Sequence, residues 1–191
     1  MADQTLIYVA QPLTTGKVFY RGPLGTTAPT DATTALAVGF VDHGWVLDEG
    51  FTDSPKRTTK KFYGFGGDLI RTVQQRYEET WQLTLCESNI NVLKTVFGDA
   101  NVTQTTSGHR KTTVNHASAP LPFSSFVMDF IDGQKTHRIY VPQGQVTEIG
   151  DIKYAHAELV SFKITIDCYK PVGATASVTT FEDEADVTGY A

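Results

Sequence analysis

The feature that most constrains the fold is a long strand-like run from Leu69 to Leu85. From Tyr77 onward it alternates between one largely apolar set of residues and one polar set. A period of two is typical of a β-strand that buries one face and exposes the other. The polar set comprises Glu78, Thr80, Gln82 and Thr84, and the opposite set includes Trp81, Leu83 and Leu85. We therefore expect the rest of the chain to be organised around this strand.

Predicted elements flank this strand on both sides. Upstream, Phe62–Phe65 is an aromatic strand that ends at Gly66-Gly67-Asp68, a glycine-rich connection suited to a hairpin. Downstream, Ser88 is a favourable N-cap for a short helix over about 89–97, and Gly98 suits its C-terminal end. A helix of about ten residues is marginal in isolation, so this one must dock on the sheet. Its apolar side comprises Ile90, Leu93 and Phe97.

Further strand-like runs are separated by turn signals along the whole chain. Pro142 and Gly144 are expected to end one run and begin another, and two weaker strands are expected around Val102 and at 112–114. The stronger runs are Leu6–Val9, Lys17–Tyr20, Phe40–Leu47, Phe123–Ile131, Thr136–Val141 and Glu158–Tyr169. Many short strands and a single helix predict a mainly β fold: a β-sandwich or barrel of two packed sheets with one short α-helix.

The predicted domain organisation is a single β domain over residues 1–170, large enough to bury a core without staples. Residues 22–36, rich in Gly, Pro and Thr, are expected to form a loop or extended arm. Residues 48–61 are polar, contain Pro55 and are expected to form a long loop. Residues 171–191 are expected to form a flexible acidic C-terminal tail with little apolar content to bury.

The charge of the chain is low and unevenly distributed. The net charge is -5, and the four carboxylates after Pro171 contribute -4, so subtraction leaves -1 for residues 1–170. A nearly neutral to acidic chain is a poor candidate for tight nucleic-acid binding, because counterion release needs clustered cations. One local basic cluster, which could also be a solvated loop, comprises Lys56, Arg57, Lys60 and Lys61.

The motifs that carry chemistry are missing from the sequence. There is no GxSxG nucleophile elbow, HExxH or GxxxxGK[ST] pattern, and the five histidines are scattered. Cys86 and Cys168 alternate with apolar neighbours and are expected to be small buried side chains. No apolar run approaches the roughly 18 residues of a membrane helix, and no secretory signal is evident. We therefore expect a binding or structural protein that is made in a cytoplasm, with no catalytic, cofactor-binding or metal-binding residues.

Three stretches together resemble the major tail tube proteins of long-tailed, siphovirus-type bacteriophages, especially those that infect actinobacteria. They are Thr30–Ser54, with its "VDHGWV" strand; Phe62–Gly98, with the aromatic hairpin and the helix; and Val141–Tyr169. Their order and spacing carry the resemblance across about residues 30–170. One departure is Phe65, where close relatives are expected to have tryptophan; this exchange retains an aromatic side chain.

The resemblance implies a structural virion protein without catalysis. Its subunits would form hexameric rings that stack into a hollow tube through which the genome passes, with kinship in fold to the type VI secretion tube protein. The implied partners are further copies of the chain, the tape measure protein, the tail terminator and the distal tail protein, with DNA only as non-specific cargo. The implied location is the virion tail, assembled in the bacterial host cytoplasm, without membrane insertion. A tail terminator or connector ring, or a carbohydrate-binding β-sandwich, is the alternative.

Two sets of residues follow from this resemblance as hypotheses. A DNA conduit must not hold DNA, so a polar, neutral-to-acidic lumen is expected, although Arg76 and Lys163 share the same faces. The predicted lumen residues are Glu78, Thr80, Gln82, Thr84, Ser161, Thr165 and Asp167. The predicted inter-ring contact residues are Asp48, Glu49, Asp53, Lys56, Arg57, Lys60 and Lys61; the 22–36 arm and the tail after Pro171 are expected to contribute as well.

Overall fold

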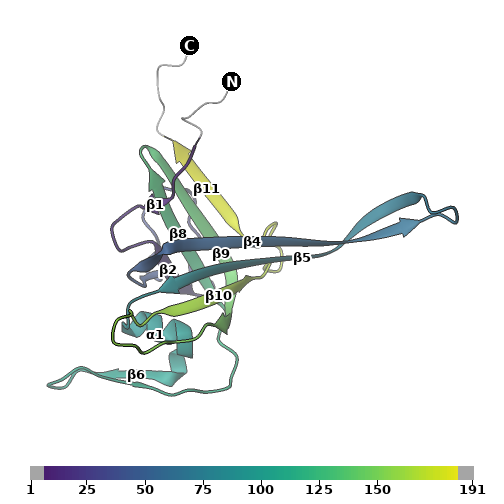
Figure 1. Cartoon of the computed structure of the whole chain (residues 1–191). Helices are drawn as coiled ribbons and strands as arrows, with labels where there is room; N and C mark the ends of the chain where they lie inside the picture. Colours follow the sequence, from purple (N-terminus) through teal and green to yellow (C-terminus); the bar gives the residue numbers. More distant parts are fainter. Residues whose placement is uncertain (1–6, 185–191) are drawn as a thin grey trace, which may run out of the picture.

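A computed structural model describes residues 7–184 of the chain and shows a mainly β fold with one α-helix (Figure 1). One sheet has nine strands in the order β3-β2-β8-β9-β10-β5-β4, with β1 paired to β8 and β11 paired to β9, and β6 and β7 form a second sheet. The strands are β1 (Gln11–Pro12), β2 (Phe19–Pro23), β3 (Val41–Asp42), β4 (Val46–Tyr63), β5 (Leu69–Leu85), β6 (Val102–Thr105), β7 (Lys111–Val114), β8 (Ser124–Asp132), β9 (Lys135–Ile149), β10 (Phe162–Cys168) and β11 (Thr179–Glu184). The helices are α1 (Ile90–Phe97) and the short 3-10 turn η2 (Asp99–Asn101).

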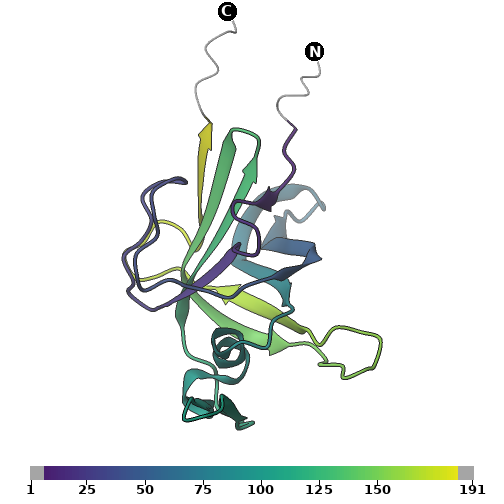
Figure 2. The same cartoon turned by 90° about the vertical axis from the view of Figure 1, so that its left-hand side faces the viewer.

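The large sheet bends around its own core. In Figure 1, β4, β5 and β10 run across the direction of β8 and β9, and the main hydrophobic cluster takes side chains from both groups. Figure 2 shows α1 and the β6–β7 hairpin at one end of the molecule, while the turn between β8 and β9 lies at the other. The predicted mainly β fold with two sheets and one helix is therefore confirmed.

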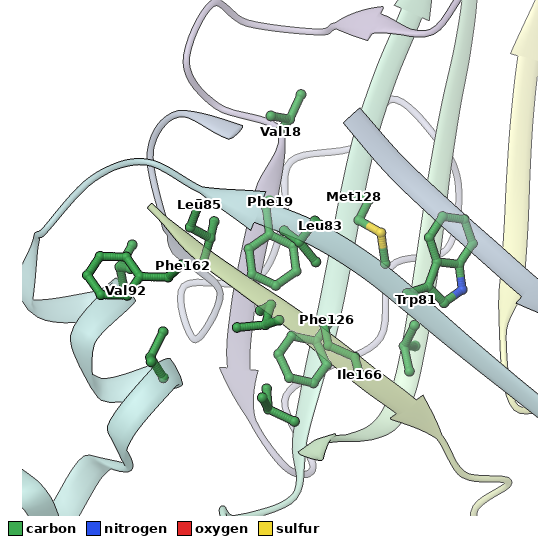
Figure 3. Packing of buried hydrophobic residues seen from close by; sticks show 14 of the residues in the cluster. Val18, Phe19, Trp81, Leu83, Leu85, Val92, Phe126, Met128, Phe162 and Ile166 are labelled. Atoms are coloured by element: carbon green, nitrogen blue, oxygen red, sulfur yellow. The ribbon is translucent and has the colours of Figure 1, made fainter. Parts of the chain in front are cut away.

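The core confirms the alternation that organises β5. Trp81, Leu83 and Leu85 point into the main cluster, where they meet Ile164 and Ile166 of β10. Figure 3 shows Leu83, Leu85 and Ile166 near Phe19 and Phe126, whose rings stack with 5.7 Å between centroids. Burying large side chains of this kind contributes about 1.5–3 kcal/mol each. This packing fixes the positions of β5 and β10, whose other face is polar and points away from the core.

The prediction of a new run at Pro142 and Gly144 is wrong, because β9 continues through both residues to Ile149. A Cβ on Gly144 would lie 2.9 Å from side-chain atoms of both Ile166 and Phe126. The glycine is therefore required by close packing between the strand and the core rather than by a turn. One continuous strand consequently joins the β8 side of the sheet to the β10 side.

The helix lies where it was predicted, but its cap and buried side differ. Asn89, rather than Ser88, is the N-cap, and its side chain accepts hydrogen bonds from the backbone N–H groups of Asn91 and Val92. Val92 and Val96 are fully buried. The predicted apolar residues Ile90, Leu93 and Phe97 are half-buried beside them. The buried side includes Thr95 because its hydroxyl has polar partners, one of which is the Nε2 atom of His43 at 2.7 Å.

The predicted 48–61 loop is instead most of β4, the longest strand, paired with β5 in an antiparallel hairpin. Its polar composition is typical of a loop, yet β5 supplies backbone partners along nearly its whole length. Pro55 is tolerated because β4 is at the edge of the sheet, where one side of the backbone needs no ladder partner. The hairpin turn predicted at Gly66-Gly67-Asp68 is confirmed between Tyr63 and Leu69.

The predicted flexible tail is wrong for residues 179–184, which form β11 on the edge of β9. Glu184 lies 3.3 Å from Lys135 and Glu182 lies 3.4 Å from His137, each in directly opposed register. The acidic segment therefore lies against a basic stretch of β9, and Phe181 packs against a small second cluster. The remainder of the predicted tail, 185–191, lies outside the described residues.

The 22–36 segment lies against the body of its own subunit. Arg138 donates from Nη1 to the backbone carbonyls of Thr34 and Asp31, at 2.6 and 3.0 Å, and pairs with the buried carboxylate of Asp129. This buried cation fixes the segment over β8 and β9. Cys86 and Cys168, predicted to be buried, are half-buried free thiols.

Candidate assembly surfaces

A polar face extends across four neighbouring strands. Directly opposed residues of antiparallel strands lie on the same face of a sheet. Gln82 of β5 is opposite Thr52 of β4 and Thr165 of β10, and Thr165 is opposite Glu148 of β9. A parallel row consists of Ser54, Thr80, Asp167 and Gln145. The opposite face of the same strands is the hydrophobic core, so this polar face is the outer surface of the sheet.

The structure brings most of the predicted lumen residues onto this face. Glu78, Thr80, Gln82 and Thr84 follow one another along β5, beside Thr165 and Asp167 on β10. Ser161 lies one residue before β10 begins, beyond the paired part of the strand. Thr84 and Thr165 are buried, so Glu78, Thr80, Gln82 and Asp167 are the more accessible members.

The charges on the polar face are mixed in sign. Lys56 is directly opposite Glu78, and Lys163 is directly opposite Thr84. Asp167 and Glu148 lie on the same face. The face is therefore polar with compensating charges, as the positions of Arg76 and Lys163 in the sequence had indicated.

The distal parts of β4 and β5 form a hairpin that extends well beyond the body (Figure 1). We call residues 56–76 the projecting hairpin; all of them are exposed apart from Gly64, which is partly covered. An isolated two-stranded hairpin is marginally stable in water. Its length and exposure therefore favour a contact with another molecule.

The four predicted basic contact residues all lie on the projecting hairpin. The guanidinium of Arg57 lies 4.7 Å from the centroid of the Tyr77 ring and donates to Oε1 of Gln74 at 3.1 Å. The Nζ atom of Lys60 lies 5.3 Å from the centroid of the Phe62 ring. Within residues 7–184, none of the four forms an ion pair. Lys56 and Lys61 are the other two exposed cations of the set.

The three predicted acidic contact residues lie at the other end of β4. Asp48 and Glu49 are exposed near the body, and Asp53 is opposite Trp81. Burial and the nearby Glu79 carboxylate raise the pKa of Asp53. The seven residues therefore form two separate groups on one strand, acidic near the body and basic on the hairpin, instead of one mixed loop.

Sequence reasoning missed the apolar tip of the hairpin. Phe65 is fully exposed, and large fractions of Leu69 and Ile70 are exposed as well. The sequence contained a signal for this tip, because the residues of β5 before Tyr77 do not alternate between apolar and polar as a half-buried strand would. Upstream of it, the adjacent residues Leu69 and Ile70 place apolar side chains on both faces of β5. Exposed apolar side chains that gather in this way are typical of a contact site.

These features define the class of protein: a mainly β structural subunit with a polar sheet face, an open strand edge and a projecting hairpin. The chain belongs to the phage tail tube protein family, because a model of that family matches residues 3–188. The predicted resemblance is thereby confirmed, and the protein is a structural component of a phage virion tail. The family is structural and is not a class of enzymes.

Other comparisons are more distant. The chain is similar to the tube terminating cap of the anti-feeding prophage, at 12% identity over 97% of this chain and 100% of that chain, with a TM-score of 0.47. It is also similar to a chain of the extended sheath-tube complex of an extracellular contractile injection system, at 6% identity over 97% and 100%, with a TM-score of 0.45. No curated protein sequence matches the chain.

Over residues 7–184, no helix has the length and hydropathy of a membrane span.

Proposed function

We propose that this protein polymerises as hexameric rings that stack into a hollow tail tube, through which the phage genome passes during ejection. The observation that carries the proposal is the long β4–β5 hairpin, which combines an open strand edge with an exposed distal half. Membership of the tail tube family supports a tube as the product of assembly. The tape measure protein, tail terminator and distal tail protein are the expected tail partners, and assembly is expected in the host cytoplasm.

Ring closure would use the open edge of β4. A long unpaired edge is a liability in a monomer, because its N–H and C=O groups can template pairing with another chain. In a closed ring of six subunits, each β4 edge would pair with the sheet of the neighbouring subunit, so no edge is left open. The joined sheets would form a continuous barrel around the channel.

The lumen would be lined by the polar face of β5 and β10. Glu78, Thr80, Gln82 and Asp167 are its accessible members, and Lys163 balances part of the negative charge. A face without a block of cations gains little from counterion release, so DNA would slide without being held. Thr84, Thr165 and Ser161 complete the proposed lining.

Stacking would bring the basic half of β4 in one ring toward the acidic half in the next. Lys56, Arg57, Lys60 and Lys61 would then approach Asp48, Glu49 and Asp53 of another subunit. Exposed ion pairs are screened by salt, so stacking should weaken as ionic strength rises. Alanine at all four basic positions should leave rings intact while abolishing this salt dependence, and unchanged tube formation would reject the pairing.

The test is negative-stain electron microscopy of the purified protein over a concentration series, alone and with its tail-assembly partners. Hollow tubes with a regular axial repeat and six-fold rings support the proposal. Isolated rings that never stack would indicate a tail terminator or connector instead. A map of the tube with the β5–β10 polar face away from the channel would reject the proposed lining.

A further inference from the structure

A pocket of about 490 Å³ opens on the body beside the start of β4. Its walls are largely aromatic and aliphatic and include Trp45, Phe51, Phe130 and Ile139. Trp45 lies against Gly16, and about half of its surface is exposed. An exposed tryptophan beside an apolar hollow is a common anchor for a protein contact.

Two buried donors beneath this pocket have no partner. Tyr8 and Trp81 both line the pocket, but the Tyr8 hydroxyl and the Trp81 indole N–H are covered by the protein itself, and neither forms a hydrogen bond within the described part of the chain. Trp81 as a whole is 7% exposed and lies at the far end of the core cluster from Val92 (Figure 3). A buried donor left without a partner costs about 1–3 kcal/mol. The accessible walls of the pocket are therefore mainly apolar, and the site suits an occupant that brings apolar surface.

Carboxylates surround the same pocket. Asp48 lines it, Glu49 follows in sequence, and both are exposed. Asp132 and Glu182 lie close enough to Tyr8 to raise the pKa of its hydroxyl, together with burial, to about 12. The rim of the pocket is therefore acidic and favours a cationic occupant.

The tip of the projecting hairpin has the complementary properties. Phe65 and Ile70 offer exposed apolar surface. Lys60, Lys61 and Arg71 lie on the adjoining strands and are exposed. The tip is therefore apolar and basic, whereas the pocket is apolar and acidic.

A subunit cannot place this tip in its own pocket. At about 3.3 Å per residue, the part of β4 from Asp48 to Tyr63 spans roughly 50 Å. Figure 1 shows the hairpin directed away from the body. Any such contact must therefore involve two copies of the chain.

We propose that the hairpin tip of one subunit docks in the Tyr8–Trp45–Trp81 pocket of a second subunit. This inference rests on the proposed tube and identifies the receptor for the stacking hairpin. Phe65 packs against Trp45, and the lysines face Asp48 and Glu49. Because tip and pocket are different surfaces, the contact is head-to-tail and can repeat from ring to ring without limit.

Disulfide trapping tests the contact directly. Gly66→Cys beside the tip is combined with Gln11→Cys at the exposed pocket rim, because neither residue has a role in the proposed contact. Oxidation of assembled tubes should give a ladder of covalent oligomers. The matched control pairs Gly66→Cys with Leu159→Cys, an exposed residue that does not line the pocket, and should remain monomeric on denaturing gels.

The outcomes separate this inference from the function on which it rests. Tubes that form normally without the Gly66–Gln11 cross-link overturn the docking and leave the tube intact. Cross-linking by Gly66→Cys alone would show tip-to-tip pairing and also overturn it. If no variant and no wild-type protein forms rings or tubes, the proposed function itself fails.

A change at the tip and a charge swap provide independent readouts. Phe65→Ser removes a fully exposed aromatic side chain, so the isolated subunit should keep its melting temperature, while the concentration needed for tubes rises about 3–10-fold. An unchanged concentration for tube formation would contradict the packing of Phe65 in the pocket. Lys60→Glu with Lys61→Glu should block assembly, and adding Asp48→Lys with Glu49→Lys should restore it; failure of that rescue contradicts the charge pairing.

Discussion

The guanidinium of Arg138 and the carboxylate of Asp129 form a paired contact in the interior, with Nε–Oδ1 and Nη2–Oδ2 distances of 2.7 and 3.0 Å. Both side chains are 4% exposed. The same guanidinium holds the carbonyls of Asp31 and Thr34. One buried cation thus joins a cross-strand pair of β8 and β9 to the 22–36 segment.

Breaking that pair should be costly. Arg138→Met leaves the Asp129 carboxylate buried without a partner, so the free energy of unfolding should fall by about 3–5 kcal/mol in urea titrations. The double variant with Asp129→Leu should recover much of the loss, because both charges are then absent. Lys153→Ala, which removes an exposed ion pair with Glu158, is the control and should have little effect. An equally small effect of Arg138→Met would contradict the assignment.

His43 should make the subunit sensitive to mild acid. Its ring is buried, with Nδ1 2.9 Å from the Val41 carbonyl, and burial lowers its pKa to about 4. The unfolded chain binds the proton more tightly, with a pKa near 6.5. The stabilisation is therefore complete above about pH 6.5 and is lost as the pH falls toward 4, by about 3 kcal/mol in all.

The measurement for His43 is the free energy of unfolding between pH 7 and 4. Comparison with His43→Gln removes the background of titrating carboxylates that both proteins share. The slope of the wild type over this range should be steeper than that of the variant. Parallel slopes would show that folding does not shift the pKa of His43.

The helix cap distinguishes two adjacent residues. Asn89→Ala removes the acceptor for two backbone N–H groups and should lower the free energy of unfolding by about 1 kcal/mol. Ser88→Ala, at an exposed neighbouring position, should be nearly neutral. Thermal melts of the two variants provide the comparison, and a larger effect at Ser88 would move the cap back to the position expected from the sequence.

Gly144 should not tolerate a side chain. A methyl group there would overlap Ile166 and Phe126, so Gly144→Ala should cost about 1–3 kcal/mol of stability in urea titrations. Gly66→Ala is the matched control, because its nearest neighbour is 3.7 Å away in an exposed turn. Equal stability of the two variants would show that β9 and the core can separate at no cost.

Much of the fold followed from local patterns. The alternation from Tyr77 to Leu85, the Gly66-Gly67-Asp68 turn and the short helix were all predictable, because each depends on near neighbours in the chain. The polar face of β5 and β10 was predictable for the same reason, since alternation alone assigns residues to one face. That this polar face lines the channel of a tube is part of the proposed function.

Other features depended on contacts between distant segments. Residues 48–61 and 179–184 have the composition of a loop and a tail, and they become strands because β5 and β9 offer them backbone partners. The pocket beside Trp45 likewise needs residues from both ends of the chain.

The sequence by itself therefore determined the mainly β class, the central strand, the helix and the membership of a tail tube family. Only the tertiary structure decided that β4 is a strand with acidic and basic halves and that its hairpin projects from the body. It also decided that an acidic, aromatic pocket forms beside the start of β4. The physical reason is that periodicity records which side of an element is buried, whereas pairing and pockets depend on which distant element supplies the other side.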